Sequence, residues 1–483
     1  MAEHPGEQTS DEALVPTKPL APQSPWAVFA VCVVSFYLIM FDLAVVNVAF
    51  PDILADFGID RTAGSWIVSL YNILFGSLLV VAGKSADSIG RRRIFQIGIA
   101  AFGLGAALAA LASNLTVLLV GRAIQGIGAA LMSPAALGLV VAAFPQDRRT
   151  QTMAFWGAVG ALGVSSGPSI GAAIIQVANW RAAFWIPAVI CAVLFVACTR
   201  TIRESPISKS AHRPDFLGAA LVTAALAVLV FGVSRSRSVG WTSPQTGVAI
   251  VIGLVTMAAF LLRQRKHPDP ILDLSLFRSR SFTVASFSGL VFFAGYGAYN
   301  LNNVLFLRQA WSYSVLEAGL LAVIGPLTVA TLSPFTGRVA SRMGFRLPAV
   351  GGPLIVAAGA VALATSFDET RQPALFMALV VVVGVGIATF GPTNQGASVA
   401  DLPPARLSVG GAVGPALRQV GAAFGVALLV AAVGTPVTGG ELVDAHSNGY
   451  LLVAAIMLLA AAINGLQTGR PQPAAAAASS ASG

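Results

Sequence analysis

Charged residues are scarce in this sequence. Asp, Glu, Lys and Arg make up 10% of its 483 residues, whereas soluble globular proteins carry about 25%. Hydrophobic residues make up 56%, and long stretches contain no charge at all. About 20 consecutive apolar residues are enough to cross a bilayer. The scarcity of charge therefore excludes an ordinary soluble protein and predicts an all-α integral membrane protein.

Metal-ligand clusters and nucleotide-binding loops are also missing. The three cysteines lie in apolar stretches without metal-ligand spacing. We expect all four histidines in terminal or loop segments, so we predict no metal or haem site and no cofactor. No G-x-x-x-x-G-K-[ST] loop occurs, which argues against an ATP-driven pump. These residues are Cys32, Cys191, Cys198, His4, His212, His267 and His446.

A basic face that could bind nucleic acid is absent as well. The formal net charge is +9, but the Lys and Arg residues sit in short clusters between apolar runs. Residues 1–25 are polar and proline-rich, without the basic start and apolar core of a signal peptide. We predict that residues 1–25 and 469–483 are disordered cytoplasmic tails, and that the protein does not bind nucleic acid.

Fourteen apolar segments lie between these tails. With the first tail in the cytoplasm, most Lys and Arg residues fall on the cytoplasmic side, as membrane proteins generally show. We therefore predict a multi-pass protein of the cell membrane with both termini inside. The segments cover roughly residues 26–50, 62–82, 93–113, 115–140, 150–176, 181–200, 215–234, 245–263, 282–308, 314–340, 346–366, 372–398, 405–434 and 448–468.

An internal repeat divides these segments into two sets of six. The run Gly83-Lys84-Ser85-Ala86 with Gly90 matches Gly337-Arg338-Val339-Ala340 with Gly344, and the Gly163-x-x-x-Gly167-Pro168 run matches Gly410-x-x-x-Gly414-Pro415. We predict six-helix bundles at 26–200 and 282–468, with a linker at 201–281 that adds two helices. Repeats of this kind place the substrate path between the halves, near the membrane midplane.

The segment from Gly83 to Arg93 carries the first family resemblance. Its Gly83, Asp87, Gly90, Arg91 and Arg92 resemble the signature loop of the major facilitator superfamily between the second and third helices. Glycine permits a tight turn and close helix approach, and Asp87 can pair with a nearby Arg. The resemblance implies a conformational role. The alternative is a generic positively charged cytoplasmic loop.

Asp42 is the acidic residue that we place well inside a span. A carboxylate within the membrane is costly and is a functional candidate by default. Its surroundings, Phe41 to Pro51, resemble the first-helix motif of drug:proton antiporters, although Ala44 stands where a Thr is common. The resemblance implies proton coupling. A structural Asp that caps a helix break is the alternative.

Arg122 lies in the fourth span, followed by Gln125 and Gly126. At about 1.5 Å per residue, Arg122 sits about 10 Å and Asp42 about 12 Å from the external side, so the two could share one site. The run resembles the fourth-helix motif of the family and implies a part in proton coupling. The alternative is an Arg that only binds backbone carbonyls.

Gly163, Gly167 and Gly171 recur every four residues on the fifth span, with Pro168 beside them. This spacing gives a smooth face for close helix packing, and proline adds a kink. The stretch resembles the antiporter motif of the superfamily, which implies export rather than uptake, although Ala172 replaces its usual last Gly. A general packing face is the alternative.

Further matches extend the resemblance to the fourteen-helix branch of drug:proton antiporters, which implies the major facilitator fold. Asp215-Phe216-Leu217-Gly218 and Gly240-Trp241 resemble its inserted helix pair. Other polar and aromatic residues could line the substrate path, and ordinary helix packing explains them equally well. These candidates are Tyr37, Asn47, Tyr71, Asn300 and Arg418.

The expected function is proton-coupled export of a small hydrophobic drug or antibiotic by a monomer in the lipid bilayer, through alternating access. An uptake symporter for a small metabolite is the nearest alternative, and the glycine face argues against it. A membrane-embedded enzyme is the alternative from another class. It would need clustered His, Asp or Cys within the membrane, which the sequence does not contain.

Overall fold

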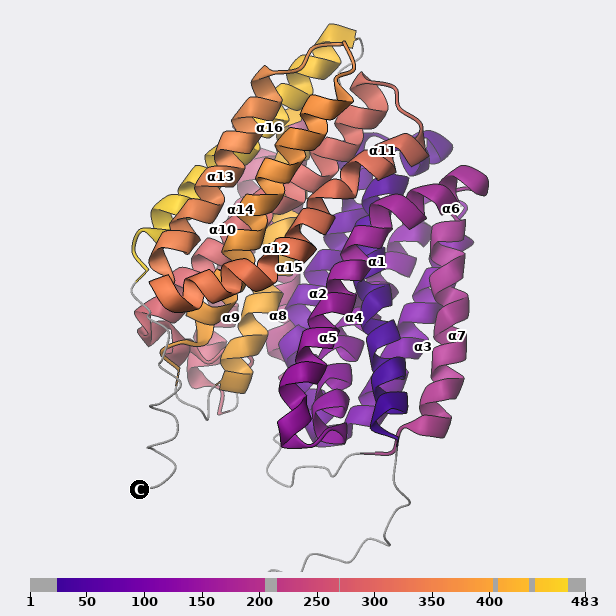
Figure 1. Ribbon diagram of the computed structural model, residues 1–483, viewed down its shortest axis with the longest axis vertical. Coiled ribbons are helices and arrows are strands. Elements are labelled where there is room, and N and C mark those ends of the chain that lie inside the picture. The colour runs from indigo at the N-terminus through magenta and orange to yellow at the C-terminus, as the bar shows by residue number, and fades with distance from the viewer. Residues whose placement is uncertain (1–23, 205–214, 269, 403–406, 434–438, 468–483) are drawn as a thin grey trace, which may run out of the picture.

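The computed structural model describes residues 24–204, 215–268, 270–402, 407–433 and 439–467. This part of the chain contains fourteen helices that are long and apolar enough to cross a membrane, which confirms the predicted number. The helices of the two halves form two bundles that lie side by side (Figure 1). The first bundle is drawn in indigo to magenta and the second in salmon through orange to yellow.

The first half contains six spans, of which the fifth is interrupted. A π-helical turn, η1, separates α5 from α6 where Pro168 lacks the N–H of a regular helix. The elements are α1 Pro25–Phe57, α2 Arg61–Ile89, α3 Arg91–Ala110, α4 Leu115–Ala143, α5 Gln146–Ser166, η1 Gly167–Gly171, α6 Ala172–Val177 and α7 Ala182–Thr201.

The second half repeats this arrangement with its own interruptions. Its first span ends in a π-helical turn, η3, and its second span is built from two consecutive helices. The elements are η2 Leu274–Arg278, α10 Arg280–Leu305, η3 Phe306–Ala310, α11 Val315–Ala322, α12 Ile324–Met343, α13 Arg346–Thr365, α14 Pro373–Val399, α15 Leu407–Val433 and α16 Gly439–Asn464.

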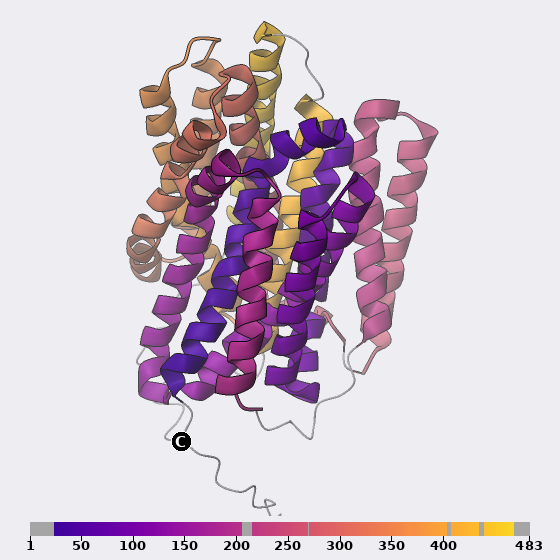
Figure 2. The ribbon, with the colours of Figure 1, turned by 90° about the vertical axis from the view of Figure 1, so that its right-hand side faces the viewer.

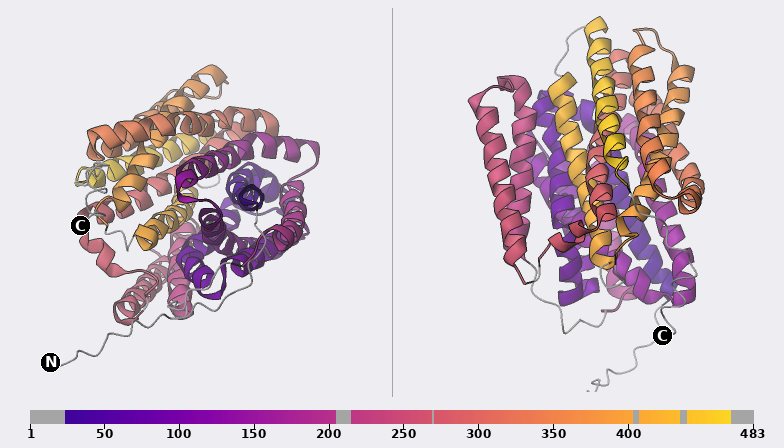
Figure 3. Two further views of the ribbon diagram at one scale, coloured as in Figure 1. Left: turned by 60° about the horizontal axis from the view of Figure 1, so that its bottom comes forward. Right: turned by 90° about the vertical axis from the view of Figure 1, so that its left-hand side faces the viewer.

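The two remaining spans form a hairpin at the edge of the molecule. Helices α8 (Phe216–Val239) and α9 (Pro244–Lys266) lie at the periphery in Figures 2 and 3. Helix α8 packs against α2 of the first half and α15 of the second. Ser77 and Thr223 share a hydrogen bond of 2.8 Å at this contact. The hairpin therefore touches both halves along their common boundary.

A buried carboxylate closes the hairpin at one end. Asp215 caps α8 by accepting the Gly218 N–H at 2.9 Å, and it accepts Arg263 Nη2 from α9 at 2.8 Å and Gln264 Nε2 at 3.1 Å. Burial raises the pKa of Asp215, but the hydrogen bonds from Arg263, Gly218 and Gln264 outweigh it and lower the pKa from 3.8 to about 2. The ionised form therefore stabilises the hairpin.

We expect the first turn of α8 to lose its protection from hydrogen exchange in acid. Because the pKa of Asp215 is lowered on folding, its contribution is complete above 3.8 and disappears as the pH falls through about 2. Hydrogen exchange at Gly218, corrected for intrinsic rates, should accelerate across that window. The first turn of α9, capped by Ser243, serves as the control because a hydroxyl does not titrate. Constant protection at Gly218 would contradict this role.

Three predicted boundaries are wrong. Helix α1 continues beyond residue 50 to Phe57, so Asp52 and Asp56 lie in its last turns, and the predicted loop at Gly83 continues α2 up to Ile89. Hydropathy indicates which part of a segment is apolar enough to lie in lipid. These helices continue through polar residues beyond that apolar part. Helix α16 begins at Gly439 rather than near 448.

The early start of α16 corrects the prediction that every histidine lies in a terminal or loop segment. His446 lies inside α16 and is fully buried. Its Nδ1 is 2.9 Å from Asn302 Oδ1, while Asn302 Nδ2 donates to the His446 carbonyl at 3.0 Å. The Asn302 oxygen can only accept, so Nδ1 carries the proton.

Candidate functional site

Asp42, Arg122 and Gln125 form one buried polar network inside the first half. Arg122 Nη1 donates to Asp42 Oδ2 at 2.7 Å and to Gln125 Oε1 at 3.0 Å, and Gln125 Nε2 donates to Asp42 Oδ1 at 3.2 Å. The three side chains are at most 1% exposed. The two motifs, which lie 80 residues apart in the chain, therefore meet directly.

Helix geometry aligns the partners on α4. Arg122 and Gln125 are three residues apart, which places them on one face of the helix. Gly126 allows this face to approach α2, because a Cβ there would lie 2.9 Å from the Tyr71 carbonyl oxygen. The close approach lets Arg122 Nε donate to the Ile67 carbonyl at 3.0 Å and brings its guanidinium 4.2 Å from the centre of the Tyr71 ring.

Arg122 has hydrogen-bond partners in the network other than Asp42. Removing one member of a buried ion pair usually costs about 3–5 kcal/mol, because it strands the other charge. Here the Ile67 carbonyl and Gln125 Oε1 still accept from the guanidinium, and the Tyr71 ring lies over it. Neutral groups therefore hold the Arg122 guanidinium together with the Asp42 carboxylate.

The predicted glycine face packs on α1, on the side away from Arg122. A Cβ at Gly163 would lie 2.9 Å from the Tyr37 carbonyl oxygen, and a Cβ at Gly167 would lie 3.0 Å from the Val45 nitrogen. A Cβ at Gly171 would lie 3.1 Å from Val45 Cβ. The backbones of α5, η1 and α1 therefore touch along the turns that carry Asp42.

The signature segment surrounds the junction of α2 and α3. Asp87 accepts Arg91 Nε and Nη2, both at 3.0 Å, and Arg91 Nη1 donates to the Gly138 carbonyl at 3.1 Å. Asp87 is exposed and its ion pair lies within the segment. A Cβ at Gly83 would have only an ordinary contact, 3.6 Å from Pro134 Cβ.

Glu204 is part of this junction and was not predicted. Its carboxylate accepts the backbone N–H groups of Arg92 at 2.9 Å and Arg93 at 3.1 Å, where the helix dipole of α3 favours a negative charge. Gly90 has φ +119°, and a Cβ there would lie 2.5 Å from the Glu204 carboxyl carbon. Only a glycine fits both the backbone and this approach.

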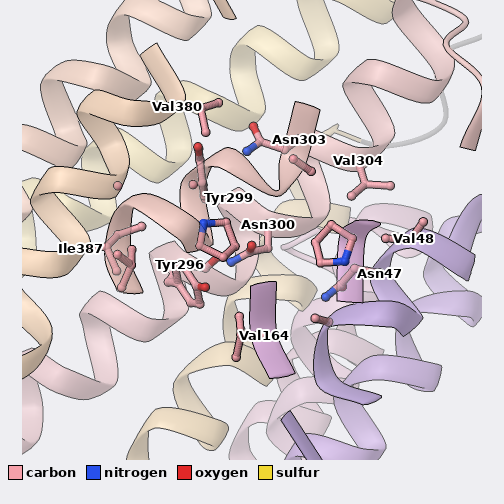
Figure 4. A pocket seen from close by; sticks show the side chains of 17 residues that line it. Asn47, Val48, Val164, Tyr296, Tyr299, Asn300, Asn303, Val304, Val380 and Ile387 are labelled. Carbon is pink, nitrogen blue, oxygen red and sulfur yellow. The ribbon is translucent and has the colours of Figure 1, made fainter. Parts of the chain in front are cut away.

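A pocket lies between the two halves. Its polar residues are Asn47 from α1 and Tyr296, Tyr299, Asn300 and Asn303 from α10, and its remaining walls are apolar parts of α5, η1, α11, α12 and α14. Figure 4 shows Asn47 on one side, facing the tyrosines and asparagines on the other. Among the described lining residues there is no Asp, Glu, Lys or Arg.

Two of the five predicted path residues, Asn47 and Asn300, line this pocket, and three do not. The Tyr37 hydroxyl is 2.7 Å from Ser166 Oγ, and Tyr71 is buried against Arg122. Arg418 lies in α15. The pocket is also lined by Tyr296, Tyr299 and Asn303 of α10. The four-residue spacing of Tyr299 and Asn303 places both on one face of α10.

The halves contact each other at the end where α1 meets α2, which we call the α1–α2 face. Arg308 Nη2 of η3 is 2.7 Å from Asp52 Oδ1 of α1. Gly319 of α11 rests on the Pro168 carbonyl of η1, where a Cβ would collide. Figure 1 shows α11 reaching across to α6 at the upper end. The structure is closed at this face.

Comparisons with known proteins agree with this architecture. Residues 32–425 match the model of the Major Facilitator Superfamily. A multidrug resistance protein of Mycobacterium tuberculosis is 31% identical over 395 residues, which cover 81% of this chain and 73% of that protein. A puromycin resistance protein of Streptomyces alboniger is 30% identical over 446 residues, which cover 90% of this chain and 87% of that protein.

Solved structures show the same fold. A POT family transporter in complex with 5-aminolevulinic acid has a TM-score of 0.65 at 17% identity, covering 91% of this chain and 94% of that one. The fourteen apolar helices and the family match over most of the chain together identify a multi-pass membrane protein. The chain belongs to the Major Facilitator Superfamily.

Proposed function

We propose that this transporter exports small hydrophobic drugs or antibiotics across the cell membrane in exchange for protons. The observation that carries the proposal is the buried network of Asp42, Arg122 and Gln125. The antiporter-type glycine face and the resistance proteins among its relatives support the direction of transport. The monomer, with both termini in the cytoplasm, is the proposed working form.

Helix α1 connects the proton site to the pocket in this proposal. Asp42 faces α4 inside the first half, whereas Ala44 and Asn47, in the next turn of α1, line the pocket. Pro51 offers no N–H to the Asn47 carbonyl, so the helix is weakened at this point. A proton on Asp42 loosens the hold of Arg122 on α1, and this change reaches the pocket one turn away.

The same helix connects the proton site to the contacts between the halves. Helix α1 also carries Asp52, which pairs with Arg308 of the second half, and it packs on η1, which touches α11. We propose that the halves, residues 26–200 and 282–468, rotate against each other and that these contacts separate when the α1–α2 face opens. The exposed pair of Asp87 and Arg91 belongs to the opposite, cytoplasmic face.

Inverted membrane vesicles test this function. Because their lumen corresponds to the outside of the cell, an acidic lumen should drive a substrate from a panel of antibiotics and dyes into the vesicles. Exchange of one proton for one neutral molecule permits about tenfold accumulation per pH unit, since each unit is worth about 1.4 kcal/mol. A protonophore should abolish the accumulation.

The control is vesicles that lack the protein. An uptake symporter would behave in the opposite way, because protons leaving an acidic lumen would carry the substrate out with them. A membrane-embedded enzyme would change the compound chemically without concentrating it. Accumulation that ignores the gradient would contradict the antiport proposal.

A further inference from the structure

Arg418 is a positive charge inside the second half that lacks a carboxylate partner among the described residues. It lies within the membrane-spanning part of α15 and is partly buried. Its Nη1 donates to Gln395 Oε1 of α14 at 3.2 Å, and its guanidinium lies 5.6 Å from the centre of the Phe293 ring. Both neighbours are neutral. A charge held inside the membrane without a counter-ion is costly and marks a functional position.

The backbone around Arg418 holds its side chain in place. Helix α15 packs closely on α10, since a Cβ at Gly297 would lie 2.7 Å from the Ala422 carbonyl oxygen. Ala422 is one turn beyond Arg418, so both lie on the face of α15 that turns to α10. On another side, a Cβ at Gly76 of α2 would lie 2.8 Å from the Ala416 carbonyl oxygen. Glycine contacts therefore fix the helix on both sides.

Two aromatic rings separate Arg418 from the pocket. The Phe293 ring, which lies beside the guanidinium, is 5.8 Å from the Tyr296 ring, and Tyr296 lines the pocket. The described lining residues carry no charge of their own. Asp42 faces away from the pocket and is already compensated by Arg122. Behind these two rings, the charge that lacks an opposite partner among the described residues is therefore positive.

We propose that Arg418 binds the carboxylate of the exported compound, while the apolar body of that compound extends past Phe293 and Tyr296 to the pocket. This inference rests on the proposed export function and names its substrate class. The guanidinium fork matches a carboxylate with two parallel hydrogen bonds. Gln395 already accepts from Arg418 through its oxygen, so its amide nitrogen remains to donate to the same carboxylate. Organic cations are disfavoured by the same charge.

The carboxylate changes the energetics of transport. Exchange of an anion for a proton moves two charges in the direction that an inside-negative potential favours. Each charge gains about 2.3 kcal/mol per 100 mV. Export of a carboxylate therefore draws on the membrane potential as well as on the pH gradient, whereas export of a neutral analogue draws less on the potential.

Binding of a matched acid and amide tests the inference. Naphthoic acid, ionised at neutral pH, and its neutral primary amide are titrated calorimetrically into the full-length protein in lipid nanodiscs. We expect the wild-type protein to bind the acid about tenfold more tightly, as a charge-assisted bidentate pair requires. Arg418→Gln should remove this preference and keep the affinity for the amide, and Arg418→Lys should keep part of the preference.

Arg371→Gln is the matched control, because it removes one positive charge from the α13–α14 connection, where Arg371 stacks on Tyr313. Its acid preference should equal that of the wild-type protein. The inference would be overturned if the wild-type protein bound acid and amide with equal affinity, or bound neither. This outcome decides the question even if Arg418→Gln fails to fold. An unchanged preference in Arg418→Gln would overturn it as well.

The vesicle assay separates this inference from the proposed function. If the pH gradient drives the amide but not the acid, the export function stands and the carboxylate site does not. If the acid is preferred in binding but its transport ignores the gradient, the carboxylate site stands and proton antiport does not.

Discussion

Replacing Asp42 with asparagine is expected to reduce transport driven by a pH gradient about a hundredfold, the lower range for removal of a positioned proton-transferring side chain. Asparagine has nearly the same size and still accepts from Arg122 through its oxygen, but it does not ionise. The measurement is the initial rate of substrate accumulation in proteoliposomes with an imposed gradient. Equal amounts of inserted protein are compared.

A second variant separates loss of coupling from loss of stability. Asp42→Asn leaves the Arg122 charge without its counter-ion, which costs up to about 3–5 kcal/mol. In the double variant with Arg122→Gln, both charges are gone, so the thermal stability should recover while gradient-driven transport stays lost. The stability changes of the two single substitutions would then not add up in the double variant, as expected for residues in contact. Recovery of both quantities would indicate that the pair is only structural.

Asp56→Asn is the matched control for the same helix. Asp56 also lies on α1, but it pairs with Arg181 at 2.8 Å near the surface and is partly exposed. Exposed ion pairs contribute little, so this variant should transport at the wild-type rate. Wild-type gradient-driven transport by Asp42→Asn itself would remove Asp42 from the coupling role.

Replacing Gly167 with valine is expected to stop transport by forcing α5 and η1 away from α1. An added Cβ collides with Ala44 Cβ and lies 3.0 Å from the Val45 backbone nitrogen, which no rotamer change can relieve. Overpacking of this kind costs about 1–3 kcal/mol. We expect at least a tenfold fall in the transport rate, because about 1.4 kcal/mol corresponds to a factor of ten.

Gly157→Val is the matched control on the same helix, because a Cβ at Gly157 meets nothing within 4 Å. It should leave transport unchanged. A milder pair adds a rescue: Gly167→Ala alone should impair transport, and adding Ala44→Gly should restore part of it by removing the nearest contact. Equal effects of Gly157→Val and Gly167→Val would contradict a specific role for the glycine face.

The membrane spans could be predicted because hydropathy responds to the solvent around a helix. The helix ends could not, since Asp52 and Asp56 prolong α1 where the apolar run has ended. His446 was placed outside a helix for the same reason, although α16 buries it against Asn302. A polar residue can be buried by another helix as well as exposed to water, and hydropathy does not distinguish the two.

The proximity of Asp42 and Arg122 could be predicted from their depth, because helix rise converts residue number into height. Partners that depend on the arrangement of helices could not be predicted. Glu204 reaches the N–H of Arg92 across 112 residues, and Asp52 meets Arg308 across 256. No local spacing indicates such pairs. The roles of all these residues in transport stay predictions until variants are measured.

Proton movement driven by a substrate gradient tests proton antiport most directly. Proteoliposomes that contain the purified protein and a luminal pH dye are given a gradient of a substrate identified in the vesicle panel, with no initial pH difference. We expect substrate flow to drive protons in the opposite direction, and Asp42→Asn to abolish this proton flow. Substrate that crosses while the luminal pH stays constant would contradict proton antiport.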